Sequence, residues 1–257
     1  MTPPEYVRPN TIEDALKALR GGTALAGGTS LAPPARHITR LVDLQDLGLD
    51  GLGVEGDQVR LGAMLRLQQL VEATGDLPGG LIDACRQEAA LNLRNMSSVA
   101  GALIACSGRS AVVTAFLALH SQVRLEPGPD QWSLNDLLDR RQAGLEGRLV
   151  TEILFQRPGT MAFAGVGRSP ADRPVVCAAV SRLAGRAPAY GVALGGFGER
   201  PVLVPQAELA LAAGDAAGAA EAARAAYAKA EDDWASGEYR AQAAATLVRR
   251  LAGEVGV

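Results

Sequence analysis

The stretch Leu25-Ala26-Gly27-Gly28-Thr29-Ser30 decides how this sequence is interpreted. Residues 23–26 are small or apolar and predict a short buried strand that runs directly into two glycines. A strand ending in Gly-Gly lets the backbone approach a ligand closely, and successive amides in such a bend form a concave donor site that suits a phosphate. The hydroxyls of Thr29 and Ser30 would add hydrogen bonds. Taken alone, the motif favours a structural turn, because turns of this form after a strand are common.

A second polar bend follows much later, at Asn95-Met96-Ser97-Ser98-Val99-Ala100-Gly101-Ala102. The small residues 100–102 permit close packing against a flat or extended ligand, although this bend alone is also compatible with a structural turn. The sequence between the two bends predicts a hairpin and two helices. That spacing suits two loops from neighbouring subdomains that converge on one diphosphate.

The rest of the chain predicts a mixture of helices and strands. Thr11 is expected to cap the first helix, since its hydroxyl can accept from an exposed amide. A shift in composition near Arg157-Pro158-Gly159 predicts a domain boundary. The further expected elements are strands at 40–44, 122–125, 149–155, 175–183 and 190–194, a hairpin at 53–63, a polar turn at 94–98, and helices at 67–73, 81–93, 111–119, 133–138 and from 205 onward.

A formal G-x-G-x-x-G occurs at residues 51–56. A dinucleotide fingerprint of this form must follow a buried strand and open a helix, because the helix N-terminus holds the pyrophosphate. Here the motif precedes a predicted strand, and no helix follows it. We therefore interpret its glycines as turn residues.

Composition excludes several classes of function. The 257-residue chain has a net charge of -3, which gives no basic field for nucleic acid and no polybasic membrane signal. No leader segment and no apolar run of about 18 residues is visible, so we expect a cytoplasmic protein without membrane insertion. Cys85, Cys106 and Cys177 are far apart, and there are only two histidines. We expect neither a metal site nor an iron–sulfur cluster on this chain.

The two bends together resemble the FAD-binding loops of the flavoprotein (medium) subunits of the molybdenum hydroxylases, the family of xanthine dehydrogenase and carbon monoxide dehydrogenase. The resemblance rests on AGGTS at 26–30 and LRNMSSVAGAL at 93–103. Three further segments agree in the same order: GRSPAD at 167–172, VALGG at 192–196, and the stretch from Ser236-Gly237-Glu238-Tyr239-Arg240 to residue 250. The resemblance thus covers nearly the whole chain.

The resemblance implies an α+β fold with two domains. Residues 1–155 would form a para-cresol methylhydroxylase-type FAD-binding domain of two α+β subdomains, at about 1–52 and 53–155. Residues 156–257 would form a flavoprotein C-terminal domain with a small antiparallel sheet and helices.

The resemblance also implies FAD as the cofactor and a set of binding residues. The first bend would bind the pyrophosphate through Leu25, Ala26, Gly27, Gly28, Thr29 and Ser30. The second bend would close it through Ser97, Ser98, Val99 and Gly101. Asp172 would lie near the flavin ring. No catalytic acid or base is expected, because the flavin carries the redox chemistry.

Two partner subunits are implied in the same way. A large molybdopterin-binding subunit would oxidise the substrate, and a small [2Fe–2S] subunit would relay electrons to FAD on this chain. FAD would pass them to NAD, a quinone or oxygen, in an oxidoreductase complex that the family builds as a dimer of heterotrimers.

Several positions depart from the family pattern. Ala100-Gly101-Ala102 stands where the family has G-G-N or G-G-S, the acid that usually follows is absent from residues 104–111, and Gly165 stands where some members have Lys. Arg109 is a candidate for neutralising a phosphate instead. These departures keep open an alternative, a degenerate non-flavin-binding scaffold or assembly subunit of the same fold. A stand-alone FAD oxidase is disfavoured, because the C-terminal part is short and Ala-rich.

Overall fold

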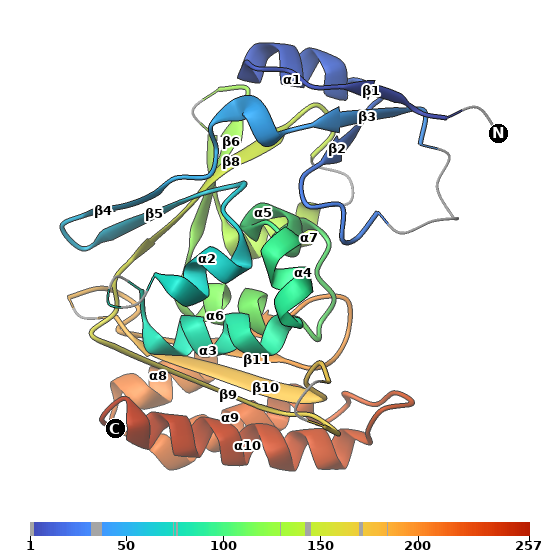
Figure 1. The fold of residues 1–257 in the computed structure, drawn as a ribbon. Helices are drawn as coiled ribbons and strands as arrows, with labels where there is room; N and C mark the ends of the chain where they lie inside the picture. Colours follow the sequence, from blue (N-terminus) through green and yellow to red (C-terminus); the bar gives the residue numbers. More distant parts are fainter. Residues whose placement is uncertain are drawn as a thin grey trace.

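The computed structural model of the chain describes residues 3–31, 38–73, 75, 77–128, 130–141, 145–169, 172–183 and 185–257. Within these ranges the chain forms three separate sheets with helices packed around them (Figure 1). The mixed helix-and-sheet architecture expected from the sequence is therefore confirmed. None of the helices in these ranges has the length and apolar character needed to span a bilayer.

The first sheet is small and parallel, in the order β1-β3-β2. Thr11 caps the helix beside it as predicted, since its hydroxyl accepts from the Asp14 amide at 3.1 Å. Ala15 of this helix is fully buried, as is Val42 of the central strand. The elements are β1 (Glu5–Val7), α1 (Ile12–Leu19), β2 (Thr23–Leu25) and β3 (Arg40–Asp43).

The second sheet is antiparallel, in the order β4-β5-β8-β6-β7. Its first hairpin turns at Gly56, whose φ is +59°, so the glycines of the formal G-x-G-x-x-G belong to a hairpin as predicted. Each of these strands is short except the central one. The strands are β4 (Leu52–Glu55), β5 (Gln58–Gly62), β6 (Gln122–Glu126), β7 (Asp130–Ser133) and β8 (Leu149–Gln156).

Six helices accompany this sheet, and α6 is entirely buried. They are α2 (Leu67–Glu72), α3 (Gly79–Glu88), α4 (Leu91–Met96), α5 (Val99–Ile104), α6 (Ala111–Ala118) and α7 (Leu134–Arg140).

The predicted single helix over 81–93 is wrong, because the chain is extended at Ala89 and begins a new helix at Leu91. Arg94 explains the break: its guanidinium donates to the carbonyl oxygens of Arg86, at 3.2 Å, and Ala89, at 2.6 Å, so it closes the end of α3. The predicted polar turn over 94–98 is correspondingly reduced to Ser97 and Ser98.

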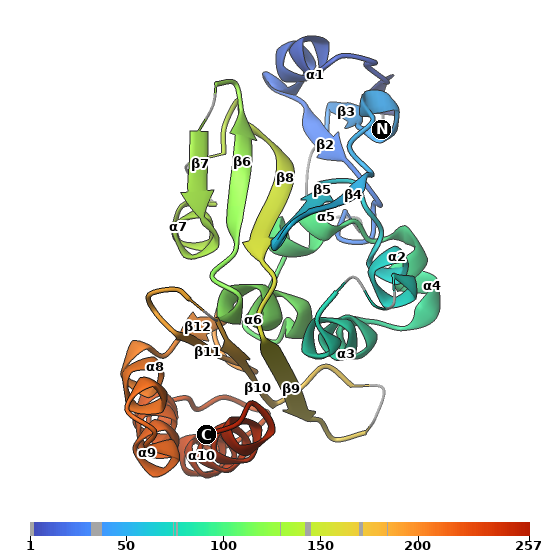
Figure 2. The same ribbon diagram turned by 90° about the vertical axis from the view of Figure 1, so that its left-hand side faces the viewer.

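The third sheet is antiparallel, in the order β12-β11-β10-β9. Figure 2 shows it between two layers: α3 and α6 lie against one face and three C-terminal helices against the other. Strand β9 was not predicted. The elements are β9 (Thr160–Val166), β10 (Val176–Arg182), β11 (Tyr190–Gly195), β12 (Val202–Leu203), α8 (Pro205–Ala212), α9 (Ala216–Tyr227) and α10 (Gly237–Glu254).

Candidate cofactor-binding site

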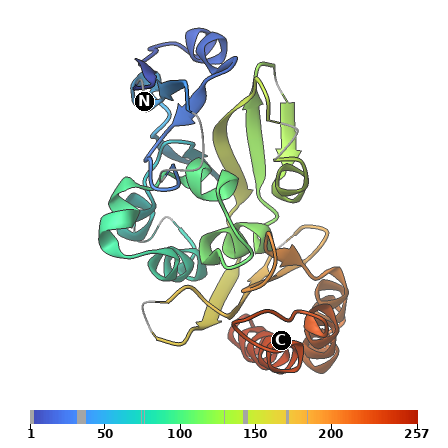
Figure 3. The same ribbon diagram turned by 90° about the vertical axis from the view of Figure 1, so that its right-hand side faces the viewer.

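The two polar bends, far apart in sequence, lie in contact. The Thr29 and Ser97 hydroxyl oxygens are 3.1 Å apart, within hydrogen-bond distance. Gly27 faces the Met96 backbone so closely that an added Cβ would overlap the Met96 carbonyl oxygen. A guanidinium nitrogen of Arg66 donates to the same oxygen. In Figure 3 the blue loop after β2 runs beside the green helices α4 and α5.

The first bend offers free backbone donors. The N–H groups of Gly27, Gly28, Thr29 and Ser30 donate no hydrogen bond within the described part of the chain. Gly28 has φ +70°, a left-handed conformation that glycine adopts without strain. Free, consecutive amides in a bend are a concave site for an anion.

The second bend is more fully engaged with the protein. The Ser98 hydroxyl accepts from the Gly101 amide at 3.1 Å and so caps α5. The Val99 amide donates to the Leu65 carbonyl at 2.8 Å, and Val99 is fully buried. The hydroxyls of Ser97 and Ser98 and the Ser98 N–H are donors that this bend can present to a ligand.

A cavity of about 500 Å³ opens between the bends and continues between the first sheet and the start of β8. This volume is typical of a site that encloses a small molecule or cofactor. Its walls are mostly apolar, apart from the bends and Arg148. The cavity is lined by Leu19, Thr23, Ala24, residues 26–31, Leu44, Ala63, Met64, Ser98, Ala100, Gly101, Ile104, Ala105, Leu145 and residues 147–150.

A second, smaller cavity of about 80 Å³ lies on the other side of the same contact. Thr29, Ser30 and Ser97 line it together with two charged residues, Glu88 and Arg173. The site therefore combines free amides, hydroxyls, a large apolar cavity and a small charged one.

The profile of the family described as "FAD binding domain in molybdopterin dehydrogenase" matches residues 2–155. The chain belongs to this family. The FAD-binding family and the oxidoreductase class that the resemblance implied are thereby confirmed.

Individual proteins are also similar to this chain in sequence. The uncharacterized protein YgfM of Escherichia coli K12 is 33% identical over 184 residues, which covers 69% of this chain and 69% of that protein.

Solved structures share the fold over almost the whole chain. Quinoline 2-oxidoreductase from Pseudomonas putida 86 has a chain that matches with a TM-score of 0.86 at 20% identity, covering 99% of this chain and 97% of that one. A chain of reconstituted carbon monoxide dehydrogenase from Oligotropha carboxidovorans matches with a TM-score of 0.85 at 24% identity, covering 99% of this chain and 98% of that one. The enzyme from Hydrogenophaga pseudoflava gives 0.85 at 22% identity, covering 98% of both chains. The fold expected from the two bends is therefore confirmed.

The bends fit the diphosphate of FAD in their chemistry. Four consecutive N–H groups without internal acceptors and two adjacent hydroxyls would hold its oxygens. Of the residues expected to bind FAD, Ala26 to Ser30, Ser98 and Gly101 line the large cavity and Ser97 lines the small one. Leu25, the last residue of β2, and Val99, which is fully buried, line neither cavity.

Asp172 lies beside the site rather than in its wall. Its carboxylate accepts from the Ser169 amide at 3.1 Å, and residues 170–171 lie outside the described ranges. The next residue, Arg173, is the one that lines the small cavity.

An acid near the cofactor site is present, but it comes from an unexpected element. Glu88, at the end of α3, accepts from the Ser110 hydroxyl at 2.9 Å and from the Val112 amide at 3.0 Å. Burial raises the pKa of its carboxyl, although the Val112 amide, the Arg173 charge and the Ser110 hydroxyl act in the opposite direction. Sequence inspection of residues 104–111 could not find it, because helix packing brings it there.

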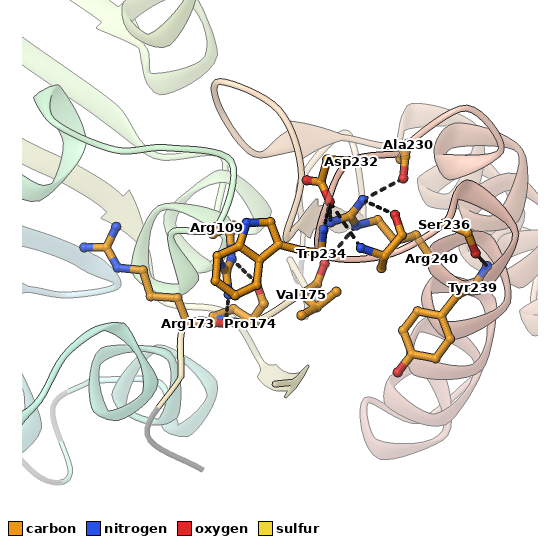
Figure 4. A network of polar contacts seen from close by, with 11 residues as sticks. Arg109, Arg173, Pro174, Val175, Ala230, Asp232, Trp234, Ser236, Tyr239 and Arg240 are labelled. Carbon is orange, nitrogen blue, oxygen red and sulfur yellow. Dashed lines mark hydrogen bonds and ion pairs between the residues drawn. The ribbon is translucent and has the colours of Figure 1, made fainter. Parts of the chain in front are cut away.

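Arg109 does not serve the phosphate site that was considered for it. Its guanidinium donates to the carbonyl oxygens of Arg173 and, at 3.0 Å, Pro174. It also stacks over the ring of Trp234 at 4.0 Å from the centroid (Figure 4). Arg109 thus fixes the backbone of the segment that carries Arg173.

Gly165, where some members of the family have Lys, packs against α3. An added Cβ there would overlap the Gln87 side chain. A long side chain at this position would therefore require Gln87 to move, which explains locally why glycine is present.

Proposed function

We propose that this chain is the FAD-carrying electron-transfer subunit of a molybdopterin-dependent hydroxylase or dehydrogenase complex. It would receive electrons from the [2Fe–2S] clusters of a small subunit and deliver them to an external acceptor. The observation that carries the proposal is the contact between the two bends, at which four free N–H groups border a 500 Å³ cavity.

The residues of the chain would act by binding and orientation. Amides of the first bend and the Thr29 and Ser97 hydroxyls would hold the diphosphate, and the apolar walls around Leu44 and Met64 would exclude water from the bound molecule. When bound, FAD supplies the ability to take up and release electrons singly or in pairs. No side chain of this chain needs to act as a catalytic acid or base.

The partners and boundaries follow from the same proposal. The Hydrogenophaga pseudoflava enzyme is described as a carbon monoxide dehydrogenase that lacks the Mo-pyranopterin moiety of the molybdenum cofactor. By kinship, we propose a large molybdopterin-binding subunit and a small [2Fe–2S] subunit for this chain, in a cytoplasmic dimer of heterotrimers. We also propose a division at residues 155 and 156, where the family match ends and a second hydrophobic core begins.

A degenerate scaffold subunit remains the second candidate because of one observation. The Val99 and Gly101 amides are bonded within the protein, so the second bend presents few donors. A chain of this kind would keep the contact between the bends without retaining flavin.

The test is flavin loading of the purified chain. We expect a yellow protein that releases FAD on denaturation. At FAD concentrations about 100-fold above the Kd, the folded state should gain about 2.7 kcal/mol and the Tm should rise accordingly. A colourless chain whose Tm is unchanged by saturating FAD would favour the scaffold instead.

A further inference from the structure

Two opposite charges in the small cavity have unused bonding capacity. Glu88 is 7% exposed, and Ser110 and the Val112 amide both donate to its Oε2, with the Ala111 amide as a further backbone donor to the carboxyl. Its other oxygen, Oε1, accepts neither of the two bonds from Ser110 and Val112. The Arg173 guanidinium donates no hydrogen bond to any described residue. Both side chains line the 80 Å³ cavity beside Thr29 and Ser97. A buried acceptor and a free donor in one cavity indicate a ligand with complementary groups.

The protein holds both groups in place from outside the cavity. Glu88 is fixed by Ser110 and by the Val112 amide at the start of α6. The backbone at Arg173 is fixed by Arg109, which is itself stacked on Trp234. In Figure 4 the Arg173 side chain extends away from Trp234. Such outside support preorganises a binding group.

The cavity is too small to enclose a whole cofactor, since such sites usually exceed about 300 Å³. It can receive one edge of a ring. The pyrimidine edge of a flavin carries one N–H between two carbonyl groups, so it needs one acceptor flanked by donors. Glu88 and Arg173 supply these two kinds of group. A guanidinium there also opposes the negative charge that a flavin gains on reduction.

We propose that Glu88 and Arg173 are positioning residues that bind the pyrimidine edge of the isoalloxazine ring: Glu88 accepts from the ring N3–H, and Arg173 donates to an adjacent ring carbonyl. This inference rests on the proposed function, because it concerns the same bound FAD. It goes beyond that function by assigning the isoalloxazine end of FAD to the small cavity and the rest of the FAD molecule to the large cavity.

The first experiment compares FAD with ADP, which shares the diphosphate and adenosine but lacks the ring. The Kd of each ligand is measured on the full-length chain by calorimetry. We expect Glu88→Gln and Arg173→Gln to weaken FAD at least about tenfold, as expected for loss of a charge-assisted bond, and to leave ADP binding unchanged.

Matched controls separate contact from general electrostatics. Glu208→Gln removes another buried carboxyl, which is bonded to His120 and the Val192 amide away from the cavity. Arg86→Gln removes another cation, which lies on α3, pairs with Asp83 at 3.0 Å and does not line either cavity. Both controls should leave the FAD Kd unchanged. Equal weakening of FAD and ADP by Arg173→Gln would overturn the proposal, because the arginine would then bind the diphosphate or adenine.

A second experiment begins with the wild-type chain and a modified flavin. FAD methylated at N3 cannot donate to Glu88, so the wild-type chain should bind it at least about tenfold more weakly than FAD. Glu88→Gln should discriminate far less between the two flavins, as expected for coupled groups in a double-mutant cycle. Equal wild-type affinity for both flavins contradicts the inference while leaving the proposed function intact. A wild-type chain that binds neither FAD nor ADP would overturn both.

Discussion

Gly27 is the residue at which the site tolerates least change. Its α-carbon lies against the Met96 carbonyl, so a methyl group would force the two bends apart. We expect Gly27→Ala to destabilise the chain by about 1–3 kcal/mol, the usual range for overpacking. FAD affinity should fall by at least about tenfold, because the bends would no longer meet. Urea unfolding and flavin titration measure the two effects.

Gly53→Ala is the matched control. Gly53 belongs to the formal G-x-G-x-x-G, has no heavy atom within 4 Å of an added Cβ, and lies within strand β4. Stability and FAD affinity should both stay close to wild type. A loss of FAD binding in this variant alone would contradict our assignment of the cofactor to the bends.

Glu88 gives the chain a predictable response to pH. Because burial raises the pKa of its carboxyl above the ordinary 4.5, the folded state holds this proton more tightly than the unfolded state. The free energy of unfolding should therefore fall as pH rises from 4.5 through the raised pKa, and stay lower above it. Arg173 faces the carboxyl and reduces the effect, and the neighbouring Cys85 and Cys106 thiols are neutral in this range because burial raises their pKa.

Glu88→Gln isolates this contribution. Relative to wild type without flavin, its free energy of unfolding should increase as pH rises from 4.5 through the raised pKa of Glu88, and level off above it. A difference that is constant over this range, in urea unfolding measured at each pH, would show that Glu88 has the same pKa in the folded and unfolded states.

Residues near the bends illustrate what a sequence can reveal about a site. The Gly27-Gly28 bend and the capping serine, Ser98, are local features. Glycine predicts a bend with positive φ, and serine before an apolar segment predicts the start of a helix. Glu88 and Arg173 carry no local signal, because the end of α3 and the start of β10 meet only after the third sheet packs on α6. Their place in the site depends on tertiary structure.

At the scale of elements, prediction succeeded where burial follows a clear pattern. Strands β8 and β10 are mostly buried and β5 alternates partly exposed and buried residues, and all three were expected. Strands β1 and β7 are edge strands of three and four residues with largely exposed side chains, so their sequences carry little apolar signal. The break between α3 and α4 was missed because apolar spacing continues through it while Arg94 ends the first helix by a side-chain contact.

Helix α10 is anchored by Arg240, a fully buried arginine in the stretch 236–240. Its guanidinium donates to the carbonyl oxygens of Val175 at 3.2 Å, Ala230 at 2.8 Å and Ala235 at 3.0 Å, and pairs with Asp232 at 2.7 Å (Figure 4). This arginine therefore joins the helix, the loop before it and the start of β10.

We expect Arg240→Met to lower the free energy of unfolding by about 3–5 kcal/mol, because it leaves Asp232 and three carbonyl groups without their partner. FAD affinity should also fall, since Trp234 and Arg109 would lose their support and Arg173 with them. Tyr239→Phe is the control: this side chain is 48% exposed, and its hydroxyl makes no hydrogen bond within the described ranges. An equal loss in both variants, measured by urea unfolding, would contradict this role for Arg240.

At the scale of the whole molecule, the third sheet joins the two proposed domains. Ala179 and Ala193 on one face belong to the same core as α6, whereas Val180 and Val192 on the other face pack with the C-terminal helices. The contact with α6 is close: the Ser181 hydroxyl donates to the Ala118 carbonyl, and a Cβ added at Gly191 would overlap that oxygen.

This arrangement predicts that the boundary at residues 155 and 156 does not separate two independently folding units. A fragment of residues 1–155 would expose the apolar face of α6 that the sheet covers, so we expect it to aggregate or to bind a hydrophobic dye, and to bind no FAD. The full-length chain should unfold in one cooperative transition, with coincident curves from fluorescence and circular dichroism. Two separated transitions, or a fragment that folds and binds FAD by itself, would contradict this prediction. Either result would show that residues 1–155 fold without the third sheet. A single transition would mean that the two parts unfold together. A destabilising substitution at Arg240, distant in sequence from both bends, would then also weaken FAD binding, because the third sheet and the segment that carries Arg173 connect the two regions.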